Sequence, residues 1–460
     1  MKPLIISDKS SKNSSAKNKR FNTFTPARVL VLGFAGIILI GAILLTLPQA
    51  TIDGKGLSFL DALFTATSAV CVTGLVVVDT GTTFSVFGQI VIMLLIQIGG
   101  LGFMTFATLF AIILGRKITL KERLLLQEAL NQVSIEGIVR LTKYIIQLSF
   151  TIEALGAFIL ALNWSVDLGW KKAIYFGIFH AVSAFNNAGF DLFGNFSSLT
   201  AYTGDIITNI TVMFLIISGG IGFVVLSDLY VNRGRKLSFH SKVVLVVSAL
   251  LIIVGTIGIF LLEMGNVNTL GNLDPLSKFL AALFQSVTPR TAGFNTINIS
   301  DMRVTSQLFI IILMFIGASP GSTGGGIKTT TFLSIVLSVI STFKGKAHIT
   351  LRERTLPQDV IQKAIAISFL ALLLVLLTTS ILTISENADF MTLLFEAVSA
   401  FGTVGLSMGI TSQLSLIGKI AIILTMFSGR VGPLTLAFAL GQNKNKKLQI
   451  KYPDERIIIG

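Results

Sequence analysis

The sequence predicts an all-α membrane protein with eight transmembrane helices and four shorter segments that enter the membrane and return. Hydrophobic residues make up 52% of the 460 residues and charged residues only 13%. The mean hydropathy of +0.82 is well above that of soluble domains. Eight apolar runs are long enough to cross a bilayer, which takes about 20 residues. The short segments between these runs share one sequence pattern.

The eight runs follow one another from residue 28 to residue 440. They lie near residues 28–48, 85–115, 142–163, 205–231, 242–263, 305–343, 360–384 and 414–440. The two runs of each successive pair enclose a shorter amphipathic segment: residues 57–70, 171–184, 276–288 and 389–401. These segments are too short to span the membrane, so we expect half-helices that enter and return. Irregular backbone is not tolerated in lipid, so the returning loops must be buried in protein or line water.

Basic residues are concentrated in alternate connections between the runs. Of the 36 Lys and Arg, 27 lie in five segments on one predicted side of the membrane, and the opposite connections are acidic. The five segments are residues 1–28, 116–143, 232–242, 344–363 and 441–460. This is the positive-inside pattern, with both termini cytoplasmic. The net charge of +14 is therefore explained by topology, and nucleic-acid binding is the weaker interpretation.

The four short segments resemble one another in sequence. They read LFTATSAVCVTGLV, IFHAVSAFNNAGFD, LFQSVTPRTAGFNT and LFEAVSAFGTVGLS. Aligned on a shared glycine, they lie 115, 104 and 112 residues apart, which is an internal repeat. Three repeats have a serine six positions before the glycine. The third repeat departs, with Val287 at that position and hydroxyls at Ser286 and Thr288 on either side.

The shared glycines favour a loop with unusual backbone angles. Small residues also permit close helix packing in membranes, but four glycines in register after half-helices favour the loop interpretation. A ring of loop carbonyls can replace the hydration shell of an ion, and the C-terminal ends of half-helices favour a cation. We expect three residues of each loop to line such a filter: Val72, Thr73, Gly74, Asn187, Ala188, Gly189, Thr291, Ala292, Gly293, Thr403, Val404 and Gly405.

The stretch GASPGSTGGGIKTTT, residues 317–331, superficially resembles a phosphate-binding loop. The match to G-x-x-x-x-G-K-[ST] is one residue out, because Ile327 precedes Lys328. The sister repeats have glycine clusters at this level, which suit packed or bent helices, whereas the composition here cannot hold a helix. We therefore expect an unwound, movable gate below the filter, formed by Gly317, Ser319, Gly321, Gly324, Gly325, Gly326, Lys328 and Arg430.

Lys328 and Arg430 are the two basic residues that the predicted topology leaves within the membrane, whereas Arg290 is assigned to the outer side. Charge within a membrane is costly and indicates function. Arg430 lies in the fourth repeat at the level of the loop in the third. We expect it to hydrogen-bond loop carbonyls and to oppose cations electrostatically; an ion pair with Glu153 or Asp228 is the alternative. Lys328 can equally snorkel toward the cytosol.

With these motifs, the chain from about residue 28 resembles the Ktr-type membrane subunits of the Ktr/Trk/HKT superfamily of potassium transporters. The resemblance implies four membrane–pore–membrane repeats around a pseudo-fourfold pore, with a gating loop in the third repeat. It implies potassium as the transported ion. We also expect sodium as an activating or coupled ion and, because the phosphate-loop match is imperfect, no nucleotide bound by this chain. It also implies a homodimer and a cytosolic nucleotide-binding regulatory ring of the RCK/KTN type. With the composition and the charge pattern, we expect a bacterial plasma membrane, contact with lipid and no nucleic-acid partner.

The expected organisation follows from the runs and repeats. Residues 1–27 are a cytoplasmic tail, 28–115 are repeat 1, 116–139 are a cytoplasmic connection, 140–231 are repeat 2, 232–343 are repeat 3 with the gating loop 317–331, 344–440 are a connection and repeat 4, and 441–460 are a cytoplasmic tail.

Regulated potassium uptake is the leading functional prediction. The alternative is a sodium-coupled or sodium-conducting secondary cation transporter. Carriers with alternating access also have broken helices, but usually in two inverted repeats. An enzyme is not predicted, because the sequence shows no motif that would bring together acid, base or metal-binding residues in the bilayer. The phosphate loop that an ATPase needs is not intact.

Overall fold

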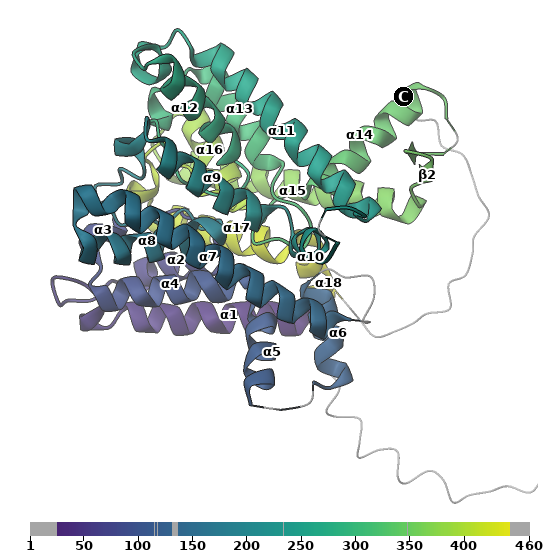
Figure 1. Cartoon of the computed structure of the whole chain (residues 1–460), viewed down its shortest axis with the longest axis horizontal. Coiled ribbons are helices and arrows are strands. Elements are labelled where there is room, and N and C mark those ends of the chain that lie inside the picture. The colour runs from purple at the N-terminus through teal and green to yellow at the C-terminus, as the bar shows by residue number, and fades with distance from the viewer. Residues whose placement is uncertain are drawn as a thin grey trace, which may run out of the picture.

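The structure is a computed structural model in which residues 25–114, 116, 118–130, 137–232, 234–346 and 348–441 are described. The fold is almost entirely helical (Figure 1). Of the two predicted cytoplasmic tails, residues 1–24 and 442–460 lie outside the described residues. The prediction of an all-α membrane protein is confirmed.

Four successive parts of the chain have the same order of elements: a long helix, a short helix, a loop and an interrupted second helix. The long helices are α1 (Pro26–Leu45), α7 (Ile138–Leu168), α11 (Phe239–Glu263) and α15 (Gln358–Ser385). The short helices are α2 (Phe59–Val70), α8 (Trp170–Phe185), α12 (Pro275–Val287) and α16 (Phe390–Gly402). The short helices lie within two residues of the predicted half-helices at both ends.

Every second helix is divided in two. The pairs are α4 (Val86–Leu101) with α5 (Phe103–Ile113), α9 (Ile206–Gly220) with α10 (Phe223–Asn232), α13 (Val304–Phe315) with α14 (Thr329–Phe343), and α17 (Leu416–Val431) with α18 (Pro433–Gly441). The first two pairs bend by 95° and 101°. Gly102, Gly222 and Gly432 stand at three of the breaks with φ of +82°, +97° and +91°, a region that favours glycine.

By length and composition, four helices of the described residues are long and apolar enough to cross a membrane. The number of such spans is six if each of the first two bent pairs is counted as one span. The other two predicted spans, 305–343 and 414–440, correspond to the divided pairs α13–α14 and α17–α18. The sequence therefore located the apolar runs but did not show that each second run breaks into two helices.

The remaining elements are short. They are η1 (Pro48–Ala50), α3 (Thr80–Thr83), α6 (Leu120–Ala129), η2 (Thr200–Tyr202), η3 (Val267–Gly271), η4 (Ile299–Asp301), η5 (Thr411–Gln413) and the antiparallel hairpin of β1 (Thr350–Leu351) and β2 (Arg354–Thr355). Helix α6 begins with a capping box formed by Thr119 and Glu122, and together with α5 it projects from the bundle (Figure 1).

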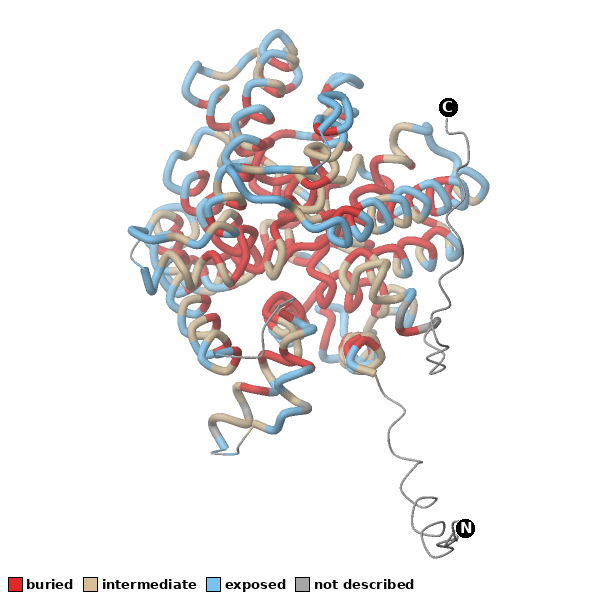
Figure 2. The backbone as a smooth tube through the Cα atoms, turned by 90° about the vertical axis from the view of Figure 1, so that its right-hand side faces the viewer, coloured by how far each residue is buried: buried red, intermediate tan, exposed pale blue. Residues whose placement is uncertain are grey.

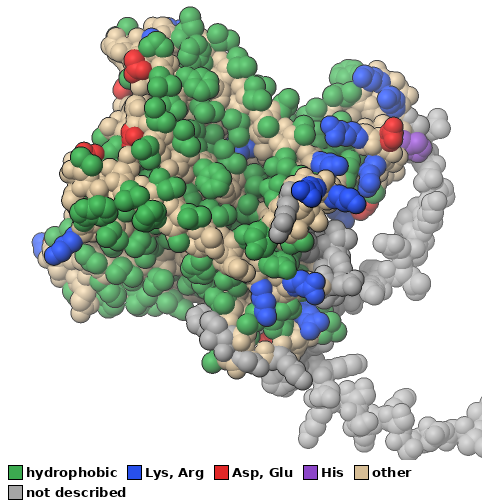
Figure 3. Space-filling view, viewed as in Figure 1, with side chains coloured by type: hydrophobic (Ala, Val, Ile, Leu, Met, Phe, Trp, Pro, Cys, Tyr) green, Lys and Arg blue, Asp and Glu red, His purple; other side chains and the backbone are tan. Residues whose placement is uncertain are grey.

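The four repeats pack in a closed circle. The first half of each second helix contacts the short helix of the next repeat: α4 contacts α8, α9 contacts α12, α13 contacts α16, and α17 contacts α2. Buried residues gather at the centre of this circle (Figure 2). Large apolar side chains such as Leu39, Phe158, Leu250 and Phe369 are exposed on the outer helices, and apolar side chains cover the flank in Figure 3. This outer surface suits a lipid environment.

Candidate functional site

The loops after the four short helices have equivalent backbone conformations. The residues two positions before the shared glycines, Val72, Asn187, Thr291 and Thr403, have positive φ values of 57°, 59°, 73° and 49°. The glycines themselves also have positive φ, from 69° to 93°. A β-branched residue with positive φ is a genuine outlier that costs about 1–3 kcal/mol. Val72, Thr291 and Thr403 are β-branched and carry this strain, whereas asparagine tolerates positive φ; the same conformation in all four loops indicates a functional constraint on the backbone.

The four shared glycines form a closed ring. A Cβ atom added to Gly74 would lie 2.5 Å from the carbonyl oxygen of Ala188 in the second loop. The corresponding distances are 2.8 Å from Gly189 to the third loop, 2.6 Å from Gly293 to the fourth, and 2.1 Å from Gly405 back to the first. Each glycine thus lies against the loop of the next repeat in cyclic order. There is no room for a side chain at any of the four positions.

A hydroxyl at the end of each short helix supports the loop that follows. The Gly74 and Gly405 amides donate to the Oγ atoms of Ser68 and Ser399, at 3.0 and 3.1 Å. In the second repeat the serine Oγ donates to the Phe190 carbonyl at 2.7 Å. Thr288 Oγ1 makes the equivalent bond to the Phe294 carbonyl at 2.5 Å.

The third repeat therefore has an equivalent hydroxyl, although Val287 stands at the aligned position. The amide before the shared glycine donates to the serine carbonyl five residues earlier in three repeats, but Ala292 donates to Thr288 only four residues earlier. The third loop is one residue shorter than its sisters. Thr288 takes the place that the ungapped alignment assigned to Val287.

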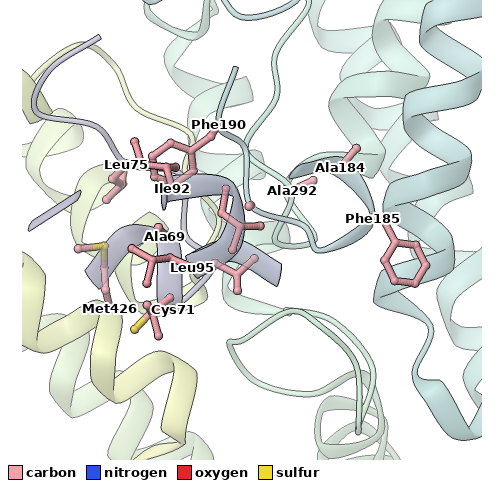
Figure 4. Close-up of a cluster of buried hydrophobic side chains, with 14 of the residues drawn as sticks. Ala69, Cys71, Leu75, Ile92, Leu95, Ala184, Phe185, Phe190, Ala292 and Met426 are labelled. Atoms are coloured by element: carbon pink, nitrogen blue, oxygen red, sulfur yellow. The ribbon is translucent and has the colours of Figure 1, made fainter. Parts of the chain in front are cut away.

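Apolar side chains hold the ring from behind. The residue after each shared glycine is almost completely buried: Leu75, Phe190, Phe294 and Leu406 are at most 2% exposed. Figure 4 shows Leu75 and Phe190 within a cluster of apolar side chains that also includes Ala69, Cys71 and Ile92. Close packing on this side leaves the loops little freedom to move apart.

Two cavities lie on either side of the ring. A cavity of about 370 Å³ is lined by all four shared glycines and by the acidic residues Asp79 and Asp191. A second cavity of about 540 Å³ is lined by residues of the predicted gate, among them Gly324, Lys328 and Arg430.

The segment between α13 and α14 is not helical, as its composition predicts, and it lies directly below two of the loops. A Cβ added to Gly324 would lie 1.9 Å from Thr291 Oγ1, and one added to Gly325 would lie 2.5 Å from Thr403 Oγ1. The amide of Ser319 donates to the Gly220 carbonyl at 3.0 Å. The segment is thus inserted between the loops and the break in the neighbouring helix pair.

Arg430 joins three repeats at this level. Its Nη1 donates to the carbonyl of Thr323 in the segment, and its Nη2 donates to the carbonyls of Gly99, in a short contact, and of Gly100, at 3.0 Å. Lys328 Nζ donates to carbonyls of its own segment, at 2.5 and 3.4 Å. The predicted contact of the arginine with loop carbonyls is present, and the lysine turns inward to the segment.

The alternative ion pairs of this arginine are absent from the part of the chain that the structure describes. The ion pairs there are Arg116–Glu122, Lys363–Asp359 and Lys419–Asp61. Glu153 is held by amide groups, and Asp228 accepts from Asn232, Ser238 and Ser241 near the start of α11.

Sequence reasoning misplaced one basic residue and missed one contact. The topology predicts Arg290 near the outer side, but it is buried in the third loop, and its Nη1 donates to the Ser248 carbonyl in the middle of α11, at 3.5 Å. The Lys419–Asp61 pair, at 2.6 Å, joins α17 to α2. No local pattern reports either contact, because the partners are far apart in the chain.

Comparisons with known proteins agree with this architecture. The family model TrkH, described as a cation transport protein, matches residues 5–448. The Ktr system potassium uptake protein B of Bacillus subtilis is 49% identical, over 95% of this chain and 97% of that protein. The potassium/sodium uptake protein NtpJ of Enterococcus hirae is 42% identical, over 95% and 97%.

A solved structure shows the same fold. The potassium transporter TrkH from Vibrio parahaemolyticus matches with a TM-score of 0.71 and 19% identity, over 92% of this chain and 86% of that chain. The predicted resemblance to the Ktr/Trk/HKT superfamily, and the prediction that the chain is not an enzyme, are confirmed. The chain belongs to the TrkH family of cation transport proteins.

Proposed function

We propose that this chain forms a pore for potassium uptake, with the ring of four loops as its selectivity filter and the segment between α13 and α14 as its gate. The observation that carries the proposal is the closed ring of Gly74, Gly189, Gly293 and Gly405 between two cavities. Carbonyl groups held in such a ring can take the place of water around a dehydrated ion. The pore is built from the four repeats at residues 28–115, 140–231, 232–343 and 344–440.

Electrostatics favour a cation in this pathway. The C-terminal ends of α2, α8, α12 and α16, which carry partial negative charge, precede the loops of the ring. Asp79 and Asp191 line the cavity on the far side of the ring from Lys328 and Arg430, and negative charge there raises the local concentration of cations. The names of the relatives, potassium uptake protein B among them, support potassium as the ion.

The proposal also includes sodium as an ion that acts beside potassium. One relative is named a potassium/sodium uptake protein, which favours sodium as an activating or coupled ion, or as a conducted ion in the alternative function. The ring has no side-chain carboxylate among its twelve residues. Discrimination between the two ions therefore depends on the positions of carbonyl groups.

The gate and its control complete the proposal. Arg430 fixes the segment to the first repeat through backbone carbonyls, so release of that contact opens the pathway. Relatives are named as proteins of a Ktr system, which supports regulation by a further subunit; we propose a homodimer with a cytosolic nucleotide-binding ring of the RCK/KTN type.

The basic end of the molecule faces the cytoplasm in this proposal, in the plasma membrane of a bacterium. Most Lys and Arg side chains in Figure 3 lie over α14, the hairpin and the region of α6, and most of the few Asp and Glu side chains lie toward the opposite end. Basic connections remain on the cytoplasmic side of a membrane.

Potassium uptake by uptake-deficient cells tests the filter assignment. A Gly293→Ser variant places a Cβ 2.6 Å from the Val404 carbonyl, whereas Gly54→Ser also has positive φ but has open space around it. We expect Gly293→Ser to lose potassium selectivity and Gly54→Ser to retain it. Wild-type affinity and selectivity in Gly293→Ser would remove the basis for the filter.

A further inference from the structure

The second loop of the ring is anchored by a polar side chain that faces away from the pathway. Asn186 stands three positions before Gly189, where the first, third and fourth loops have Cys71, Arg290 and Gly402. Its Nδ2 donates to Gln97 Oε1 at 2.8 Å and to Glu153 Oε1 at 3.0 Å. The three side chains come from α4, α7 and the end of α8, and they form one buried cluster.

Glu153 is the acceptor at the centre of this cluster. It is 4% exposed, on a helix that crosses the membrane. Both of its carboxylate oxygens accept from Gln97 Nε2, each at 3.0 Å. No ion pair among the described residues includes it. A carboxyl group is expensive to bury in a membrane protein, so its presence there indicates a role beyond packing.

The cluster holds the backbone of the second loop. Asn186 is the C-cap of α8, and the next residue is Asn187, whose φ of +59° is the positive φ that all four loops share at this position. Asn186 cannot turn or shift without breaking its bonds to two other helices. The position of the following carbonyls up to Gly189 is therefore tied to Gln97 and Glu153.

The same cluster touches the helix that anchors the gate. A Cβ added to Gly100 would lie 2.1 Å from Asn186 Oδ1, so the side chain lies directly against this glycine. The carbonyl of Gly100 accepts from Arg430 Nη2 at 3.0 Å. The cluster thus stands between the second loop and the contact that fixes the gate.

We propose that Glu153 is a positioning residue for ion selectivity, which holds Asn186, and with it the second loop of the ring, both directly and through Gln97. The proposal rests on the proposed function of the ring as a selectivity filter. It predicts that selectivity depends on the carboxylate of Glu153 and the amides of Gln97 and Asn186, although none of these three residues lines the ring.

Exchange of the two long side chains tests the proposal. In Glu153→Gln, an NH2 group replaces one of the two carboxylate oxygens that accept from Gln97 Nε2. Two donors then face each other, and the amides must rearrange, which disturbs the bonds that hold Asn186. In the double variant Gln97→Glu with Glu153→Gln, the carboxylate moves to position 97. There it can accept from Asn186 Nδ2 and from the new glutamine, so every donor regains an acceptor.

The measurement is the ratio of potassium to sodium uptake in uptake-deficient cells that carry the full chain, because this ratio cancels differences in expression. We expect Glu153→Gln to lower the ratio about tenfold, equivalent to about 1.4 kcal/mol, and the double variant to restore it to within about threefold, or about 0.6 kcal/mol, of wild type. Glu263→Gln is the matched control: Glu263 is also buried and accepts from Thr269 and Asn266, but it lies at the end of α11 away from the ring.

Three outcomes would overturn the proposal: an unchanged ratio in Glu153→Gln, a double variant no better than the single one, or an equal loss in Glu263→Gln. Gly189→Ser separates this failure from failure of the proposed function. If Gly189→Ser loses selectivity while Glu153→Gln keeps it, the filter stands and the positioning role falls. If Gly189→Ser keeps selectivity, the filter assignment itself falls.

Discussion

Replacement of Arg430 by alanine should raise potassium flux in the absence of any regulatory subunit. The arginine makes three hydrogen bonds, two to the first repeat and one to Thr323 in the gate segment. The two bonds to Gly99 and Gly100 hold the guanidinium on the frame, so the single bond to Thr323 ties the gate to it.

The size of the effect follows from that single bond. A hydrogen bond that involves a charged group contributes about 1.5–3 kcal/mol. Its loss should shift the ratio of open to closed gates roughly 10- to 150-fold. Loss of the positive charge below the ring lowers the barrier to cations as well, so both effects raise the flux.

Two further variants separate the bond from the charge. Arg430→Lys keeps the positive charge, but a lysine lacks the planar guanidinium that bonds carbonyls of two repeats at once. The potassium flux of Arg430→Lys should therefore exceed that of the wild type, but by less than the flux of Arg430→Ala does. Lys328→Met removes a charge whose hydrogen bonds stay within the segment, so it should leave the contact between gate and frame in place. The assay is potassium efflux from proteoliposomes containing the full chain. Unchanged flux in Arg430→Ala would refute the gate role.

Three other perturbations have distinct expected results. Gly405→Ala should abolish selectivity in ion-competition uptake assays, because its Cβ would lie 2.1 Å from a carbonyl of the first loop. Gly409 also has positive φ but has open space around it, so Gly409→Ala should cost only about 1–2 kcal/mol of backbone strain and should retain selectivity. Lys419→Ala should lower the free energy of unfolding in detergent by about 1–2 kcal/mol, because the side chains of Lys419 and Asp61 in this ion pair are only 18% and 23% exposed. If the variant lost as much stability in 1 M salt as in low salt, the ion pair would not be the cause. The hydrogen bond from the backbone N–H of Thr119, the N-cap of α6, lowers the pKa of Glu122. This carboxylate therefore stabilises α6 at pH values above its unfolded pKa, and the stabilisation disappears as the pH falls through the lowered pKa. Hydrogen exchange of the α6 amides should become faster over this pH range in the wild type, and Glu122→Gln should show no such pH dependence.

Much of the fold was predictable because its determinants are local in the chain. Apolar runs report membrane segments without knowledge of their neighbours, and the short helices end within two residues of the predicted ends. A backbone with positive φ favours glycine wherever it occurs, so the demand for Gly74 and its three equivalents is visible in the sequence. The composition of residues 317–327 likewise excludes a helix without reference to any partner.

Two other features could not be predicted from sequence motifs: a one-residue gap in the alignment of the repeats and the positions at which the second helices break. Thr288 replaces the missing serine only because the third loop is one residue shorter. The second helices break at glycines such as Gly102, but glycine in a membrane helix also serves packing, so the sequence left the breaks undecided.

By itself, the sequence determined the class of fold, the fourfold repeat, the loop glycines and the unwound segment, because apolar length and backbone angle are properties of consecutive residues. Only the tertiary structure decided the closure of the ring, the partners of Arg430 and the cluster of Gln97, Glu153 and Asn186. Most of those contacts join different repeats, and the partners lie up to 331 residues apart. A buried polar group takes its partner from whichever helix packs beside it, and the order of residues along the chain does not record that choice.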